Sequence, residues 1–322
     1  MALPTIFENN RLPVVAAPMF LVSGDELTIA TCKAGITGTF PALNQRTTEG
    51  FEQWVVKITE ELNAFREAHP DAPCGHFGVN LIVHRSNPRL QADLEVVVKH
   101  KVPLVITSLG AVSEVVEAVH SYGGVVFHDI TNRRHAEKAA EAGVDGVILV
   151  AGGAGGHAGT LNPFALMAEI RSFFKGTILL AGAISSGSDV VAARAMGADL
   201  AYMGTRFIAT QESNAQPEYK QMICEARAED IVHTPAVSGV PASFMQQSLA
   251  ANGYDLAKLK DPTAVDFGKK LTVNDEAKAW KTVWSAGHGV SAIGDVPTVA
   301  ELVERLEDEY RQTLKRLSTE LG

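Results

Sequence analysis

The chain has 322 residues, of which 46% are hydrophobic and 20% charged, and its formal net charge is −9. A globular protein with a large core is expected, and one α/β barrel with a single insertion accommodates this length. The negative charge and the lack of Lys/Arg clusters exclude the nucleic-acid-binding proteins, because a phosphate backbone needs a basic surface.

The apolar runs are too short for a membrane protein. The most apolar one, residues 12–22, has eleven residues and two prolines, whereas a spanning helix needs about 20. The first ten residues contain neither a basic segment nor a cleavable apolar stretch, so we expect no export signal and a cytoplasmic location. Cys32, Cys74 and Cys224 are odd in number and widely spaced, which indicates free thiols rather than disulfides or a metal site.

Between residues 14 and 207, short apolar runs alternate with helical patterns, as in βα units around a parallel sheet. The sequence predicts eight strands, at 14–19, 35–40, 77–83, 103–109, 125–130, 146–151, 177–183 and 200–207. Eight units favour a closed (β/α)8 TIM barrel. An open doubly wound sheet would follow if one predicted strand, 35–40 above all, were helical.

Helices are predicted between these strands and after them. Ser23, followed by Glu26, predicts a capping box at the start of the first helix. Further helices are predicted at 51–68, 89–100, 113–121, 134–142, 163–174 and 189–196. A helical stripe of apolar residues within 298–321 predicts a last helix that packs against the barrel exterior.

After Thr210 the pattern changes to helical segments without a clear strand, at 217–228, 241–251 and 274–283. We therefore predict a barrel formed by residues 1–210 and 284–322, and a smaller helical insertion domain of residues 211–283. The insertion forms either a lid over the active site or an oligomer contact, and a homodimer is the expected oligomer. The sequence leaves these two roles open.

The carboxyl ends of the predicted strands are rich in glycine and polar residues. Active sites of α/β barrels lie at these ends. Gly182 and Gly204 lie at the carboxyl ends of the last two predicted strands, and residues 185–187 stand at a helix start, which presents backbone N–H groups to an anion. We therefore predict a phosphate-bearing cofactor here. The alternative is that both glycines merely relieve crowding.

Residues 152–159, GGAGGHAG, place His157 in a flexible loop at the catalytic end of the barrel. Their five glycines allow the backbone to pass close to a planar ligand. Because an imidazole with an unperturbed pKa of about 6.5 exchanges protons near neutral pH, we predict that His157 is catalytic. A structural histidine is the alternative.

The sequence lacks a Rossmann GxGxxG with its acidic partner, and it lacks a Walker loop. A mononucleotide flavin therefore fits these features better than a dinucleotide does.

These segments resemble the nitronate monooxygenase family, which includes FMN-dependent enoyl-acyl carrier protein reductases and NADH:quinone reductases. The motifs that carry the resemblance are AAPMF at 16–20, FGVN at 77–80, AGGHAG at 154–159, LAGAISSG at 180–187, YMGTRFIATQES at 202–213 and WSAGHG at 284–289. The resemblance covers the whole chain, and it is specific for the family but not for one activity within it.

The resemblance implies an FMN barrel in which His157 is the catalytic histidine. The residues implied to hold FMN are Pro18, Met19, Asn80, Gly155, Gly156, Gly182, Ala183, Met203, Gly204, Thr205, Ser285, Ala286 and Gly287. His128, at the end of the fifth predicted strand, is a further candidate for the pocket. Family chemistry implies that O2 oxidises small alkyl nitronates, and nitroalkanes deprotonated by His157, to carbonyl compounds and nitrite.

Two other functions stay open. A reductase that passes hydride from NAD(P)H to a quinone or an enoyl thioester would use the same motifs. A non-redox lyase or isomerase acting on a phosphorylated metabolite would also use a phosphate site. Such an enzyme usually needs a Schiff-base lysine or paired strand-end carboxylates, and the predicted strand ends offer only one carboxylate, Asp129.

Overall fold

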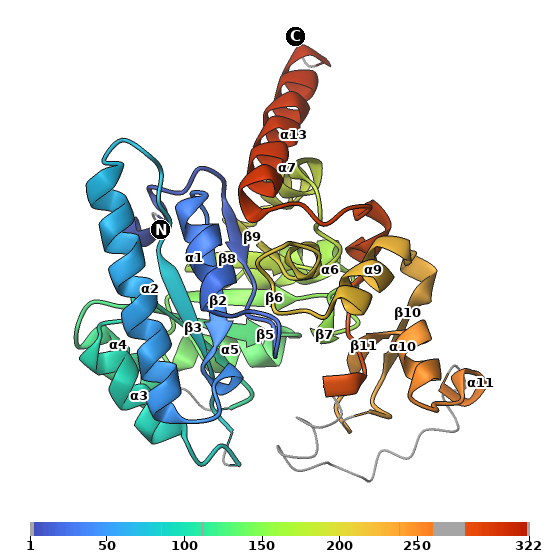
Figure 1. Ribbon diagram of the computed structural model, residues 1–322, viewed down its shortest axis with the longest axis horizontal. Coiled ribbons are helices and arrows are strands. Elements are labelled where there is room, and N and C mark those ends of the chain that lie inside the picture. Colours follow the sequence, from blue (N-terminus) through green and yellow to red (C-terminus); the bar gives the residue numbers. More distant parts are fainter. Residues whose placement is uncertain (1–2, 85, 111–112, 238, 260–280, 321–322) are drawn as a thin grey trace.

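The computed structural model describes residues 3–84, 86–110, 113–237, 239–259 and 281–320. Within these ranges, eight parallel strands close into a barrel (Figure 1). They are β1 (Val14–Ala16), β2 (Thr37–Pro41), β3 (Phe77–Ile82), β4 (Leu104–Ser108), β5 (Val125–Ile130), β6 (Gly146–Val150), β8 (Thr177–Ala181) and β9 (Leu200–Met203). Val15 of β1 lies opposite Tyr202 of β9 and closes the ring. The predicted (β/α)8 TIM barrel is confirmed.

The first and last predicted strands extend too far at their carboxyl ends. β1 ends at Ala16, and β9 ends at Met203 because a short helix, α8 (Thr205–Ile208), begins there. The segment 35–40, the weakest prediction, does contain a strand, β2. The earlier ends leave Pro18, Met19 and Gly204 in the connections at the barrel mouth.

Seven helices follow barrel strands and surround them: α1 (Asp25–Lys33), α2 (Thr48–Ala68), α3 (Leu90–Lys99), α4 (Ser113–His120), α5 (Arg133–Glu141), α6 (Pro163–Arg171) and α7 (Gly187–Ala195). Their positions agree with the prediction, but the capping box of Ser23 and Glu26 is wrong. Gly24 is the N-cap of α1, and Ser23 Oγ instead accepts a hydrogen bond from Met19 N, 2.9 Å away.

Strand residues alternate between two apolar cores, because successive side chains point to opposite faces of a strand. The barrel interior contains Ile106, Phe127, Ile148 and Tyr202. Their neighbours along the strands, such as Val126, pack outward against the helices. This alternation identifies which strand-end side chains face into the barrel.

Residues 211–283 contain strands that the sequence analysis missed. β10 (Ile231–Thr234) pairs antiparallel with β11 (Ala242–Met245), and β11 pairs with β7 (Gly156–His157) of the glycine-rich segment. The prediction of an insertion without strands is therefore wrong. Ala242–Met245 fits a helical pattern locally, and the pairing with β7 makes it a strand.

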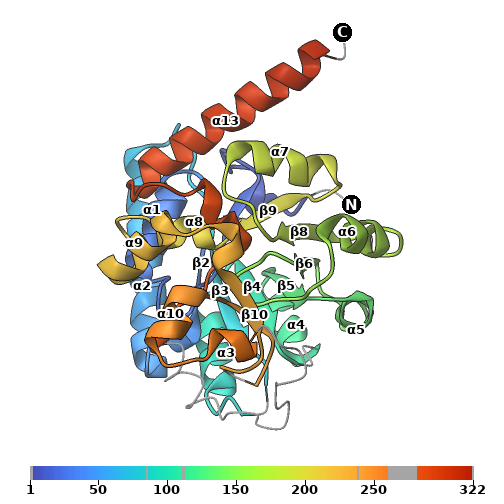
Figure 2. The same cartoon turned by 90° about the vertical axis from the view of Figure 1, so that its right-hand side faces the viewer.

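The described helices of this region are α9 (Pro217–Glu225), α10 (Gln246–Ala251) and α11 (Leu256–Leu259), and they lie on one side of the barrel (Figures 1 and 2). The prediction of a helix at 241–251 is correct only for α10. Most of the helix predicted at 274–283 lies outside the described residues. The division of the chain at residues 210 and 284 stays a prediction.

The last helix, α13 (Val299–Glu320), packs against α7 and α1 with its first half, where Leu302 and Leu306 are buried. Its second half projects from the barrel (Figure 1), and Leu314 and Leu317 are 45% and 39% exposed. The predicted packing is thus confirmed for the first half and wrong for the second. Among the described helices, none is both long and apolar enough to cross a membrane.

Candidate active site

The predicted site residues gather at one end of the barrel because all eight strands are parallel. Pro18 and Met19 follow β1, Asn80 lies in β3, and the glycine-rich segment follows β6. Gly182 follows β8 and Gly204 follows β9. A hydrogen bond from Ala17 N to Met203 O, 2.9 Å long, joins the ends of β1 and β9. These segments therefore lie at one mouth of the barrel.

His157 lies in a short strand rather than in a flexible loop. In β7, Gly156 lies opposite Ser243 and His157 lies opposite Ala242 of β11. Antiparallel pairing with a strand from the insertion therefore fixes the backbone that carries the imidazole. No local sequence pattern indicates this pairing, because the two segments are more than 80 residues apart.

The segment Ser285-Ala286-Gly287 holds the mouth together. Ser285 Oγ accepts a hydrogen bond from Gly156 N and donates one to Ser243 O, and both are 2.6 Å long. Gly287 N donates to Thr205 Oγ1, 2.9 Å away, at the start of α8. We call residues 285–287 the clamp, since they connect the glycine-rich segment, β11 and α8.

The clamp leaves no room for side chains on the backbone that it touches. A Cβ added to Gly287 would lie 2.5 Å from Gly153 O, and one added to Gly155 would lie 2.9 Å from the carbonyl carbon of Ala286. Contacts this short do not occur for real Cβ atoms. The glycines at 155 and 287 are thus required by close backbone packing.

Burial sets the protonation state of His157. Desolvation lowers the pKa of its imidazole to about 4, from the usual value near 6.5. At neutral pH the ring is uncharged, and one of its nitrogens can accept a proton or a hydrogen bond. The site therefore offers a neutral base next to the glycine-rich backbone.

The helix start predicted to bind an anion is occupied by carboxylates of the protein. Asp189 Oδ2 accepts hydrogen bonds from the backbone N–H groups of Ser185 and Ser186, each 2.9 Å long. Glu309 Oε2 of α13 accepts one from Gly187 N, 2.7 Å away. The expectation that residues 185–187 present free N–H groups is therefore wrong. The capping box of α7 itself uses those of Ser185 and Ser186, and a helix more than 100 residues further along the chain caps that of Gly187.

The chain can now be compared with known proteins. The sequence profile described as nitronate monooxygenase matches residues 5–309. This chain belongs to the nitronate monooxygenase family. It is therefore an oxidoreductase, and membership implies a flavin cofactor.

Individual relatives of this nitronate monooxygenase family member are distant. It is 28% identical to a nitronate monooxygenase of Paraburkholderia phytofirmans, over 95% of this chain and 94% of the relative. It is 30% identical to a (3aS,4S,5R,7aS)-5-hydroxy-7a-methyl-1-oxo-octahydro-1H-indene-4-carboxyl-CoA dehydrogenase of Rhodococcus jostii, over 74% of this chain and 63% of the relative. A nitroalkane oxidase from Streptomyces ansochromogenes shares the fold, with a TM-score of 0.79, 23% identity and coverage of 97% and 99%.

The glycines of the mouth fit a flavin of the kind that the nitronate monooxygenase family uses. A Cβ added to Gly204 would have no protein atom closer than 3.7 Å. The φ of Gly204 is −102°, a value that any residue can adopt, so the backbone conformation does not require glycine either. A Cβ on Gly156 would meet nothing within 4 Å, but its φ of +66° lies in the left-handed region, and this conformation accounts for the glycine. Since neither packing nor backbone conformation requires glycine at position 204, this position leaves open a surface on which a ligand can approach the backbone.

Three polar side chains of the mouth form a chain across β3, β4 and β5. Asn80 Nδ2 donates to Ser108 Oγ, 2.9 Å away, and Ser108 Oγ donates to Asp129 Oδ2, 2.6 Å away. Of these, the sequence analysis assigned only Asn80 to the site. The position of Asp129, two residues after the inward-facing Phe127, could have revealed that its side chain also faces into the barrel.

His128 lies on the opposite face of β5, with Val126, toward the helices. Its Nδ1 is 2.8 Å from Thr107 Oγ1, and burial, followed by the charge of His135, lowers the pKa of its imidazole to about 4. A cofactor contact by His128 stays a prediction, and this orientation of the side chain does not favour it.

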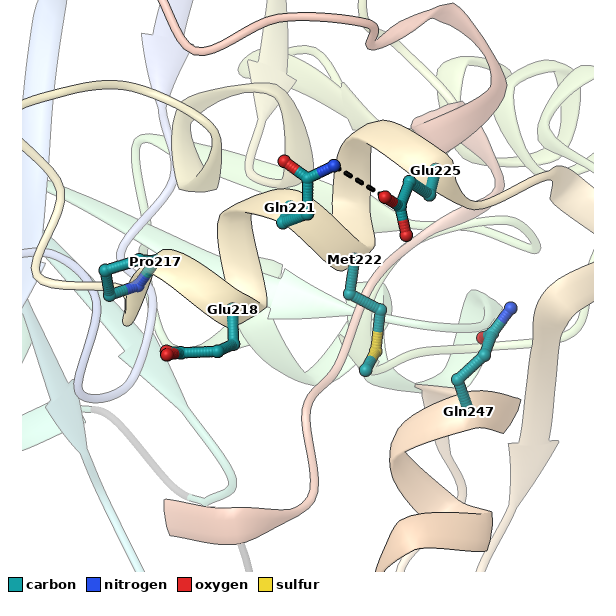
Figure 3. Close-up of a pocket in the computed structure, with 6 residues that line it drawn as sticks. All are labelled: Pro217, Glu218, Gln221, Met222, Glu225 and Gln247. Atoms are coloured by element: carbon teal, nitrogen blue, oxygen red, sulfur yellow. Dashed lines mark hydrogen bonds between the residues drawn. The ribbon is translucent and has the colours of Figure 1, made fainter.

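A surface hollow of about 550 Å³ lies away from these residues, between α9 and the start of α10 (Figure 3). It is lined by Pro217, Glu218, Gln221, Met222, Glu225 and Gln247, and a hydrogen bond joins Gln221 to Glu225. None of the residues predicted for the site lines it. This hollow is therefore separate from the predicted site at the barrel mouth.

Proposed function

We propose that this chain binds FMN at the barrel mouth and oxidises small alkyl nitronates with O2 to carbonyl compounds and nitrite. The observation that carries the proposal is the uncharged, half-buried His157, held by β11 and the clamp at the open end of a barrel of this family. A nitronate is already electron-rich, so the protein has to supply only the flavin, a proton acceptor or hydrogen-bond donor, and a pocket poor in water.

FMN would be held by segments that the fold brings to the mouth. We assign the phosphate to the backbone near Gly182, Ala183, Gly204 and Thr205, because Gly204 is open to approach. Residues from the other strand ends and the clamp would line the remainder of the flavin: Pro18, Met19, Asn80, Gly155, Gly156, Met203, Ser285, Ala286 and Gly287. When bound, the flavin accepts electrons from the substrate and passes them to O2.

The low pKa of His157 favours preformed nitronates over neutral nitroalkanes as substrates. An imidazole with a pKa of about 4 is a weak base, and proton abstraction is most efficient when the pKa of the base lies near the working pH. His157 would donate a hydrogen bond to the anionic nitronate or, more slowly, accept the α-proton of a nitroalkane. In both roles His157 would contact the substrate directly.

The test is a turnover assay with the purified chain and an alkyl nitronate, in which O2 uptake, nitrite and the carbonyl product are measured together. We expect nitrite and carbonyl compound in equal amounts, O2 consumption that requires nitronate, and no requirement for NADH. Steady NADH oxidation with a quinone or an enoyl thioester, without turnover of nitronate, would contradict the proposal.

A second candidate function is oxidation or reduction of an acyl thioester. The relative from Rhodococcus jostii, which is named a CoA-thioester dehydrogenase and is 30% identical, favours it. The same assay separates the two candidates, because only the nitronate reaction releases nitrite. We also expect a homodimer that works in the cytoplasm.

A further inference from the structure

Asp129 occupies a well-defined position in the barrel mouth. It lies at the carboxyl end of β5 and faces the interior, where burial and, to a lesser extent, the charge of Asp129 raise the pKa of the Tyr202 hydroxyl. Asp129 Oδ2 accepts the Ser108 hydrogen bond at the end of the chain that begins at Asn80. Asn80 is anchored in turn by a hydrogen bond from its Nδ2 to Ile106 O, 3.2 Å away. The described hydrogen bonds thus hold the carboxylate through Oδ2 alone.

The second oxygen, Asp129 Oδ1, is buried and has no hydrogen-bond partner among the described residues. Burial raises the pKa of the carboxyl group to about 6, and the Ser108 hydrogen bond opposes this shift only in part. At pH 7 the group is therefore mostly ionised and can only accept hydrogen bonds. A buried hydrogen-bond acceptor without a donor destabilises the fold. A hydrogen-bond donor on a bound ligand would remove this destabilisation.

The surroundings indicate which ligand group supplies this donor. Ile106, Phe127 and Ile148 face the same barrel interior, with Ile148 directly opposite Asp129 in the register of β5 and β6, and Ala154 and Ala158 of the glycine-rich segment belong to the same apolar cluster. A flat apolar ring fits this apolar lining better than the hydroxylated chain of the cofactor does. An oxidised isoalloxazine ring carries a single N–H donor, the imide N–H between its two carbonyl groups.

We propose that Asp129 is a flavin-binding residue whose Oδ1 accepts a hydrogen bond from the imide N–H of the ring. The inference rests on the FMN binding proposed above. It assigns Asn80, Ser108 and Asp129 to one function, in which Asn80 and Ser108 position the carboxylate.

The test measures two dissociation constants for the flavin-free full chain, one for FMN and one for an FMN analogue that is methylated at the imide nitrogen. Flavin fluorescence reports the binding of each. For the wild type we expect the dissociation constant of the methylated analogue to be about 10- to 100-fold higher, as for the loss of a hydrogen bond to a charged group. Asp129→Ala should bind FMN more weakly by a similar factor and should lose the preference between the two flavins.

Asp129→Asn and Asp145→Asn form a matched pair of variants that both keep the side-chain shape. Asp145 lies at the opposite end of the barrel, where its Oδ2 accepts a hydrogen bond from Val126 N. We expect Asp129→Asn to reduce the preference for FMN and Asp145→Asn to leave it unchanged. A preference that persists in both Asp129 variants, or equal weakening of both flavins, would overturn the inference while FMN binding stands. A wild-type chain that binds no flavin would overturn both.

Discussion

At the scale of one residue, His157 shows how desolvation lowers the pKa of a histidine. In the folded chain its pKa is lowered to about 4, whereas in the unfolded chain it titrates near 6.5. Between these values the unfolded state binds the proton more readily, so folding stability is lost as the pH falls from about 6.5 to about 4. Above pH 6.5 this loss disappears, because the imidazole is neutral in both states.

We predict that His157→Asn retains flavin and loses activity on neutral nitroalkanes by about 100-fold or more, the usual contribution of a general base. Activity on preformed nitronates should fall by about 10-fold or less, because no proton has to be removed. The measurement is kcat/KM for a nitroalkane and its nitronate, with flavin content as the control. Equal losses on both would mean that His157 only positions the substrate.

The same variant tests the pH dependence. In the flavin-free wild type, the unfolding free energy should fall between pH 6.5 and pH 4 because His157 resists protonation in the folded state. His157→Asn should lose less over this range, and the difference between the two losses should reach up to about 3 kcal/mol, because one pKa unit corresponds to about 1.4 kcal/mol. Urea unfolding at several pH values measures the difference. Parallel pH profiles would show that the pKa of His157 is not lowered.

At the scale of elements, the mouth depends on β7, β11 and the clamp, which meet through backbone contacts. Gly287→Ala would place a Cβ 2.5 Å from Gly153 O. We expect this variant to lose about 1–3 kcal/mol of unfolding free energy, as overpacked sites do, and to retain less flavin. Thermal unfolding and the ratio of flavin to protein measure the two effects.

Gly294→Ala is the matched control, since a Cβ at Gly294 meets nothing within 4 Å. Its stability should differ from that of the wild type by less than about 1 kcal/mol, and its flavin content should be unchanged. If both glycine variants behaved alike, the clamp would not have the close packing described above.

Individual elements also show what the sequence could predict. The strand 125–130 is predicted with its observed bounds, because a β-branched apolar run between turn residues is a local signal. The capping of Gly187 by Glu309, and the pairing of His157 with Ala242, join segments that are far apart in the chain. No local pattern indicates such contacts, so the prediction of a flexible loop was wrong. By contrast, the capping box of Ser186 and Asp189 is a local pattern, and it could have shown that the N–H groups of residues 185 and 186 are not free.

At the scale of the whole molecule, the barrel follows from the repeated alternation of strands and helices, and its mouth follows from their parallel direction. The sheet β10-β11-β7 could not be predicted in this way, because Ala242–Met245 becomes a strand only through its partners. Similarly, the apolar pattern of α13 continues through Leu314 and Leu317, so it does not indicate that these two residues lie beyond the surface that buries Leu306. Tertiary contacts decided each of these cases.

The central claim, that electrons pass from a nitronate to a flavin at this mouth, is tested most directly by anaerobic stopped-flow absorbance spectroscopy. The purified chain is mixed with an alkyl nitronate in one experiment and with NADH in another, and the flavin spectrum is recorded. We predict rapid loss or change of the oxidised flavin spectrum with nitronate alone and none with NADH alone. Rapid reduction by NADH alone, or a purified chain without any flavin spectrum, would contradict the account.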